Sequence, residues 1–179
     1  MSVRRASDGC GWVLVHPRCV RERAEDLEEV RAMVDAGELD VAIDELHWLV
    51  SGCSEFVEAH TLLGELALAA DNDVRLARGH FGFAVELVLK ALERAKVAGE
   101  LPYRQPANRA FFAAGRGLVW CLAKLDMMPK AAELVDTLVR LDPTDPVELR
   151  KLLDELQTGG LPIVELTRDF RSSADSSGD

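Results

Sequence analysis

The 179-residue sequence lacks a long apolar run. No uninterrupted apolar stretch reaches the roughly 18 residues that a membrane-spanning helix requires. The first residues, Met1 to Ser7, lack the apolar core of a signal peptide. We therefore expect no membrane partner and a cytoplasmic location.

Cysteine is also scarce. The chain has four cysteines at irregular spacing: Cys10, Cys19, Cys53 and Cys121. This usage fits a reducing compartment better than a disulfide framework. Cys10, His16 and Cys19 lie close in sequence, and His47 or Cys53 would complete a four-ligand zinc site, but no Cys-x-x-Cys pair is present. We expect no metal or other cofactor, and the alternative is a small zinc- or thiol-dependent protein that uses Cys10, His16 and Cys19.

Positive charge is in deficit, with 21 Lys and Arg against 31 Asp and Glu and a net charge of −10. Nucleic acid is therefore not expected as a partner, because phosphate backbones are bound by clustered cations. The charges are uneven: Ala24 to Ala70 holds twelve acidic residues and only Arg31 as a cation, whereas Asp71 to Gly117 holds eight basic and five acidic residues. Solvated helix faces explain this simply, and a basic partner or head-to-tail association is the functional alternative.

Signatures of catalysis are lacking too. Gly115-Arg116-Gly117 lies within a helical pattern and follows no strand, so it is not a phosphate loop. The acidic pairs Glu28-Glu29 and Asp44-Glu45 are adjacent on helices, where neighbours point in different directions. Nothing in the sequence places a Cys beside a His as a nucleophile and its base, or supplies a group to orient them. We expect a protein that is not an enzyme.

What the sequence does contain is helical periodicity in a chain that is 48% hydrophobic and 29% charged. Apolar residues at helical spacing predict seven helices: Val20 to Val34, Leu39 to Val50, Phe56 to Ala70, Gly79 to Arg94, Phe111 to Leu125, Pro129 to Leu141 and Leu149 to Leu156. Ser54 and Asn108 are predicted helix caps, Pro129 suits a first turn, and Asp145 to Glu148 has the chemistry of a capping box. The fold class is therefore predicted to be all-α.

The most apolar of these helices, Gly79 to Arg94, carries two apolar stripes and is expected to be packed on both sides near the centre of the domain. An insertion is predicted before it, at Asp71 to Arg78, and a proline-containing link after it, at Ala95 to Ala107. The predicted organisation is an N-terminal arm over 1–19, anchored by Trp12, a helical domain over 20–158, and a tail over 159–179 that ends in disorder.

Three helix-to-helix connections repeat one feature, a small residue at the same place: Ala42, Ala84 and Ala131. This internal repeat resembles the tetratricopeptide repeat, with Leu63-Gly64 at the Leu-Gly pair of that family and Leu138 to Asp145 similar to its usual ending. The resemblance covers most of Ala24 to Leu156. It implies about three antiparallel helix hairpins and a C-terminal capping helix, arranged as a right-handed α-α superhelix or as a compact helical bundle.

The first unit departs from the repeat pattern, because Asp26 and Glu29 occupy positions where the family has apolar side chains. The opening helix of that unit must therefore pack in a shifted way. Regular superhelical stacking is for this reason only one of the two arrangements that the resemblance implies.

The resemblance also implies a binding surface, since ligands of this family lie in a concave groove lined by the first helix of each pair. The positions that match are Glu58, Thr61, Glu65, Arg116, Trp120 and Lys124. Trp120, flanked by the cations Arg116 and Lys124, would anchor an extended or helical peptide, and ordinary core packing is the alternative for this residue. We expect a scaffold or adaptor that binds another protein, a peptide or a copy of itself, with a purely self-associating structural module as a further alternative.

Overall fold

A computed structural model describes residues 1–7 and 9–159. The predicted disordered end of the tail, Ser172 to Asp179, lies outside the described residues. The elements in chain order are β1 (Ser2–Arg5), β2 (Trp12–Val15), α1 (Arg18–Glu22), α2 (Ala24–Ala36), α3 (Leu39–Gly52), α4 (Val57–Asp71), α5 (Val74–Arg94), the 3₁₀ turn η1 (Pro106–Asn108), α6 (Arg109–Lys124), α7 (Met128–Leu141) and α8 (Leu149–Gln157). The predicted all-α class is confirmed for most of the chain, with one β-hairpin added.

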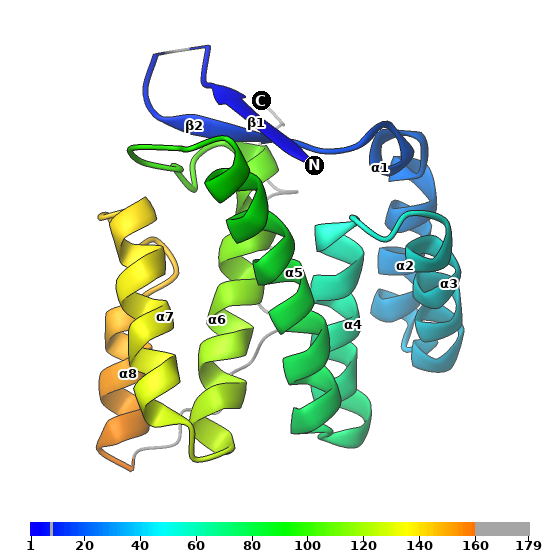
Figure 1. Ribbon diagram of the computed structural model, residues 1–179. Helices are drawn as coiled ribbons and strands as arrows, with labels where there is room; N and C mark the ends of the chain where they lie inside the picture. The colour runs from blue at the N-terminus through cyan, green and yellow to red at the C-terminus, as the bar shows by residue number, and fades with distance from the viewer. Residues whose placement is uncertain (8, 160–179) are drawn as a thin grey trace, which may run out of the picture.

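The helices stand in a row, with α2 and α3 at one end and α7 and α8 at the other (Figure 1). The three most extensive helix contacts are those of α4 with α5, of α5 with α6, and of α6 with α7. Helix α4 also packs against α6, and α6 against α8. The helices α4, α6 and α8 therefore form one layer, against which α5 and α7 lie. No helix in the described ranges is both long and apolar enough to cross a bilayer.

Most helix boundaries follow from local sequence. Gly37 ends α2 in the left-handed region, with φ 80°, and its N–H reaches the carbonyls of Met33 and Val34. Pro129 lies in the first turn of α7, where its missing N–H costs nothing. The predicted position of Pro129 in a first turn is confirmed.

The predicted insertion at Asp71 to Arg78 is wrong. Helix α4 continues to Asp71, and α5 begins only three residues later at Val74. The Asp73 carboxylate accepts hydrogen bonds from the backbone N–H groups of Arg75 and Leu76, at 3.0 and 2.9 Å, and so caps α5. The polar residues that indicated a loop therefore start a helix of 21 residues.

Three further predicted caps differ from the structure. Helix α4 is preceded by Phe56 and has no side-chain cap, so Ser54 does not serve there. Asn108 makes no cap either, because its side chain is committed elsewhere. Asp145 does cap α8, accepting from the N–H groups of Leu149 and Arg150 at 2.7 and 3.0 Å, but the helix begins at Leu149 rather than at the preceding proline.

The core has two parts that meet in α4. One part joins α4 to α8, and the other joins α2, α3 and α4. Phe81 of α5 is fully buried at the centre of the first part, and the glycines Gly64 of α4 and Gly117 of α6 lie against its ring. The prediction that this helix is packed on both sides holds for the stripe containing Phe81. The second stripe is only partly covered, since Phe83 is 41% exposed.

The N-terminal arm is a two-stranded antiparallel hairpin that lies across one end of the helices, beside the α5–α6 link (Figure 1). Trp12 anchors it as predicted, through backbone and indole N–H groups that donate to Glu100 O and Ala98 O at 2.9 and 3.2 Å. The fully buried Asn108 accepts from Leu14 N–H at 3.0 Å and donates to the carbonyls of Trp12 and Pro102. Strand β1 is exposed and polar, which is why its sequence carries no strand pattern.

Candidate partner-binding face

The six predicted binding residues lie on two neighbouring helices of one layer, three on α4 and three on α6. Thr61 shows which side of α4 meets α6. Its Oγ1 donates to Val57 O at 2.9 Å and lies 3.4 Å from Ala110 O of α6. Thr61 is buried in this contact, so the structure places it in helix packing rather than on the surface.

Arg116 has a structural partner as well. Its Nε donates to Val147 O at 3.1 Å, which fixes α6 to the connection between α7 and α8. The half-buried guanidinium is therefore held beside the helix row. The remaining four residues, Glu58, Glu65, Trp120 and Lys124, are at least partly accessible, and we call them the α4–α6 face.

Glu58 and Glu65 lie two turns apart on α4, so they share one side of the helix. Glu58 is ion-paired with Arg31 of α2, which also pairs with Glu28. Glu65 is half-buried, and burial raises its pKa to about 8; the neighbouring Glu58 charge raises it further, and Arg31 lowers it. At neutral pH the Glu65 carboxyl is mostly protonated, and it has no hydrogen-bond partner within the described residues.

Trp120 is half-buried on α6, one turn before the exposed Lys124. The Lys124 ammonium lies 5.2 Å from the centre of the indole ring, a cation–π contact. The indole Nε1 is buried and has no hydrogen-bond partner among the described residues. The i, i+4 spacing predicted this neighbourhood, whereas the unpartnered N–H depends on the packed structure.

The α4–α6 face therefore combines an aromatic ring, a cation, an ion-paired carboxylate and a neutral carboxyl. The indole N–H and the Glu65 carboxyl have no hydrogen-bond partner among the described residues. A carbonyl from outside would satisfy the indole N–H, and a donor would satisfy Glu65. The α4–α6 face provides no nucleophile with an adjacent base.

A cluster of histidines joins α3, α4 and α5, and the sequence interpretation missed it. The ring of His80 lies 6.2 Å from that of His47 and 5.9 Å from that of His60, and His60 lies 4.6 Å from the Phe83 ring. Burial lowers the pKa of His60 and of His80, and the neighbouring histidines lower both further. The three residues come from three helices at unrelated spacing, so no local pattern indicates that they meet.

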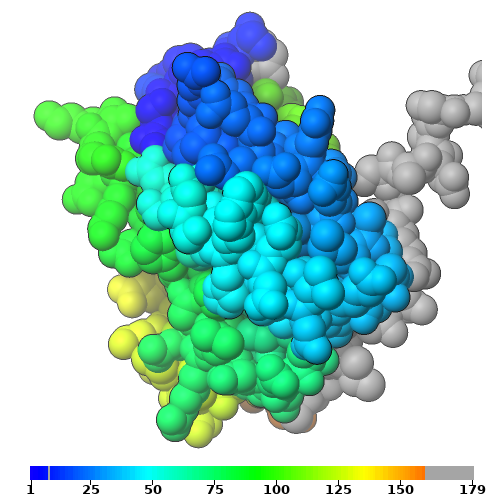
Figure 2. All heavy atoms as spheres, turned by 90° about the vertical axis from the view of Figure 1, so that its right-hand side faces the viewer, coloured from blue at the N-terminus to red at the C-terminus, as the bar shows by residue number. Residues whose placement is uncertain are grey.

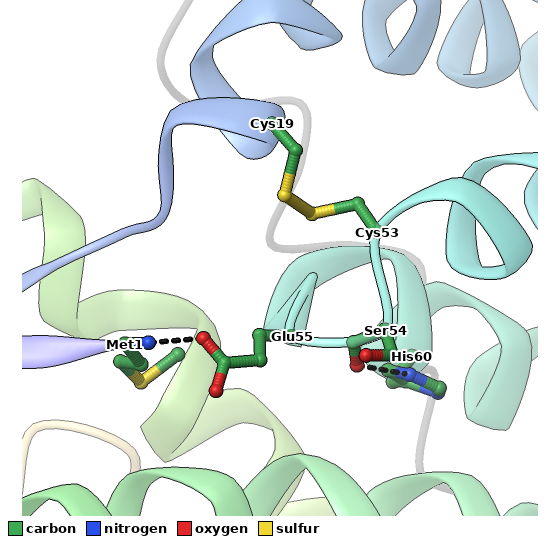
Figure 3. The surroundings of a disulfide bond; sticks show 6 residues. All are labelled: Met1, Cys19, Cys53, Ser54, Glu55 and His60. Atoms are coloured by element: carbon green, nitrogen blue, oxygen red, sulfur yellow. Dashed lines mark hydrogen bonds and ion pairs between the residues drawn. A yellow bond between two sulfur atoms is a disulfide. The ribbon is translucent and has the colours of Figure 1, made fainter.

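The cysteines behave differently from the expectation. Cys19 and Cys53 form a disulfide that joins α1 to the α3–α4 connection, with a Cα–Cα distance of 5.9 Å (Figure 3). The expectation that the cysteines remain thiols is therefore wrong for these two. No local pattern in the sequence indicates this pair, because the two cysteines are 34 residues apart.

Two of the three residues in the alternative zinc site already have other partners. Cys19 is bonded to Cys53, and His16 Nε2 lies 2.9 Å from Ala107 O. Across residues 1–7 and 9–159, no three His, Cys, Asp or Glu side chains are arranged to hold a metal ion.

No family model, no curated protein and no solved structure matches the chain.

Proposed function

We propose that this protein is a non-enzymatic scaffold that binds a segment of a partner protein on the α4–α6 face. The arrangement of the helices supports this proposal. Helices α4 and α5 form one antiparallel hairpin, α6 and α7 form the next, and α4 also packs against α6. That alternation is the one expected of tetratricopeptide-like units, in which the first helices of successive pairs line a common face.

The small residues of the predicted repeat support the same arrangement. Gly64, at the position of the Leu-Gly pair, lies directly against the Phe81 ring, and Gly117 of the next pair lies against the same ring. Side chains at either position would hold the helices apart. The close approach of α4, α5 and α6 therefore depends on these glycines.

The observation that carries the proposal is the buried indole N–H of Trp120 without an acceptor. A buried donor that lacks a partner costs about 1–3 kcal/mol. When binding turns the indole so that its N–H faces the bound segment, a backbone carbonyl of the segment removes this cost, while an apolar side chain of the segment packs on the half-buried ring.

The acidic residues indicate what else the segment carries. Glu58 is already ion-paired with Arg31, whereas Glu65 ionises readily once a positive charge lies beside it, since a nearby cation lowers the pKa of a carboxyl. We therefore propose a segment with an apolar anchor and a Lys or Arg residue. Net negative charge over the whole protein favours encounter with such a basic segment.

The test is selection of binding peptides from a displayed library, followed by calorimetric titration of the best peptide. Trp120→Phe keeps a six-membered aromatic ring and removes the five-membered ring of the indole with its N–H, and we expect it to weaken binding about tenfold or more. Trp48→Phe is the matched control, because Trp48 lies on α3, away from the α4–α6 face. This variant should bind the peptide with the affinity of the wild type. Equal losses in the two variants, or selection of no peptide, would reject the proposal.

The cytoplasmic location and the absence of nucleic-acid and membrane partners stay predictions from the sequence.

A further inference from the structure

A second surface lies on the other side of the helix row, between α5 and α7. It is an open groove of about 480 Å³. Its floor is apolar and comes from Leu118, Leu122 and Met127, and α5 contributes the exposed Phe83 and the small residues Gly79 and Gly82. Nothing lies within 4 Å of a Cβ placed on Gly79, and the nearest atom to one on Gly82 is 3.9 Å away. The groove is therefore open where another helix would need to approach closely.

The charged residues at this groove are the cations Arg78 and Lys130 and the carboxylate Glu86. The Arg78 guanidinium donates a hydrogen bond to the Met127 sulfur at 3.7 Å. In the part of the chain that the structure describes, neither cation is paired with a carboxylate. Glu86, at the groove as well, is paired with Lys90 at 2.5 Å. The groove thus fits an apolar ridge that carries a carboxylate.

Helix α3 of the same chain presents such a ridge. Val41, Asp44 and Trp48 follow one another at i, i+3 and i+7 and lie on one side of the helix. Val41 is 52% exposed and Trp48 is 53% exposed, the two most exposed large apolar side chains of the described residues. Asp44 is exposed between them and has no cation partner among residues 1–7 and 9–159.

The ridge and the groove lie too far apart to meet within one molecule. Helix α3 stands at one end of the row and α7 near the other (Figure 1). Viewed from the α3 side, blue to teal residues face the viewer, and the yellow residues of α7 show only at the lower left edge (Figure 2). Contact between the two surfaces therefore requires two molecules.

We infer that the α3 ridge of one molecule docks into the α5–α7 groove of a second copy of this chain. Two different surfaces meet in such a contact, so a pair of molecules still has one ridge and one groove unused. Association by a contact of this kind continues head to tail unless the geometry closes a ring. One helix in a shallow groove buries less area than a standard interface, so the contact is weak and sensitive to salt. It uses neither Trp120 nor Glu65 and is independent of the function proposed above.

The experiment is sedimentation velocity over a concentration series at low and high salt. The wild type should show an average mass that rises with concentration and falls with salt. Asp44→Lys, which spoils the ridge, and Lys130→Glu, which spoils the groove, should each sediment as monomers at every concentration. Asp154→Lys makes the same charge change on an exposed position of α8 and should associate like the wild type.

Mixing the two defective variants is the decisive step. The Lys130→Glu protein retains its ridge and the Asp44→Lys protein retains its groove, so a mixture should regain complexes of at least two chains. A wild-type protein that is monomeric throughout would overturn the inference. Variants that associate normally would overturn it as well, and so would a mixture that stays monomeric.

Discussion

At the scale of single residues, Glu65 links folding to pH. Burial raises its pKa from 4.5 to about 8 in the folded protein. Well below pH 4.5 the Glu65 carboxyl is protonated in both the folded and the unfolded chain, so it does not change the free energy of unfolding. As pH rises from there, the unfolded chain ionises first, and the free energy of unfolding falls until the folded carboxyl has ionised as well.

Glu65→Gln should therefore stabilise the protein at high pH and change little at low pH. An amide cannot ionise, so the variant avoids the cost of a buried carboxylate. We expect a gain of about 1–2 kcal/mol in the free energy of unfolding at pH 9 and almost none at pH 5. Urea denaturation at the two pH values measures this difference.

Glu133→Gln is the control for that experiment, since Glu133 is exposed on α7. Its effect should be small and the same at both pH values. An equal gain for Glu65→Gln at pH 5 and pH 9 would mean that Glu65 does not hold a proton in the folded protein.

At the scale of elements, close packing of α4, α5 and α6 depends on the ring of Phe81. A Cβ at Gly64 would lie 2.7 Å from this ring and one at Gly117 would lie 2.6 Å from it. Because Phe81 is fully buried between the two helices, it has little room to move. We expect Gly64→Ala and Gly117→Ala each to lower the free energy of unfolding by about 1–3 kcal/mol, measured by urea denaturation.

Gly79→Ala should instead raise the free energy of unfolding in the same experiment. Gly79 lies inside α5 with open space around its Cα, so alanine adds helix propensity without a clash. A gain of about 0.5–1 kcal/mol is expected. Destabilisation by all three substitutions would show that the glycines matter for another reason than room for Phe81.

Helices could be predicted from the sequence wherever one apolar face is repeated, as in α4, α6 and α7. The start of α5 could not, because the same residue, Asp73, is typical both of a loop and of a helix cap, and only the hydrogen bonds distinguish the two. For the α4–α6 face, the sequence predicted that Trp120 and Lys124 are neighbours, one turn apart. It could not show that Thr61 faces α6, since this depends on how two helices are rotated against each other.

At the scale of the whole molecule, two long-range contacts attach the N-terminal segment to the end of the helix row that contains α1 and α3. The disulfide fixes Cys19 to Cys53, and the N-terminal ammonium of Met1 pairs with Glu55, two residues further on (Figure 3). Neither contact has a local signal in the sequence. Both join the N-terminal segment to the α3–α4 connection, next to the histidine cluster that contains His60.

The disulfide should be a major part of the stability of the molecule. A cross-link between residues 34 positions apart restricts the unfolded chain and contributes about 3–4 kcal/mol. Urea denaturation with and without dithiothreitol should show a loss of this size for the wild type. The double variant Cys19→Ser and Cys53→Ser should have the lower stability in both conditions.

Alkylation under denaturing conditions checks the bond itself. Before reduction only Cys10 and Cys121 should react, and after reduction all four cysteines should. In the folded protein Cys121 should stay unmodified, because burial raises the pKa of its thiol to about 12 and leaves almost no thiolate. Four reactive cysteines before reduction, together with a stability that dithiothreitol does not change, would show that the protein folds without the cross-link. The contact between α1 and the α3–α4 connection would then depend on packing and on the Met1–Glu55 pair alone.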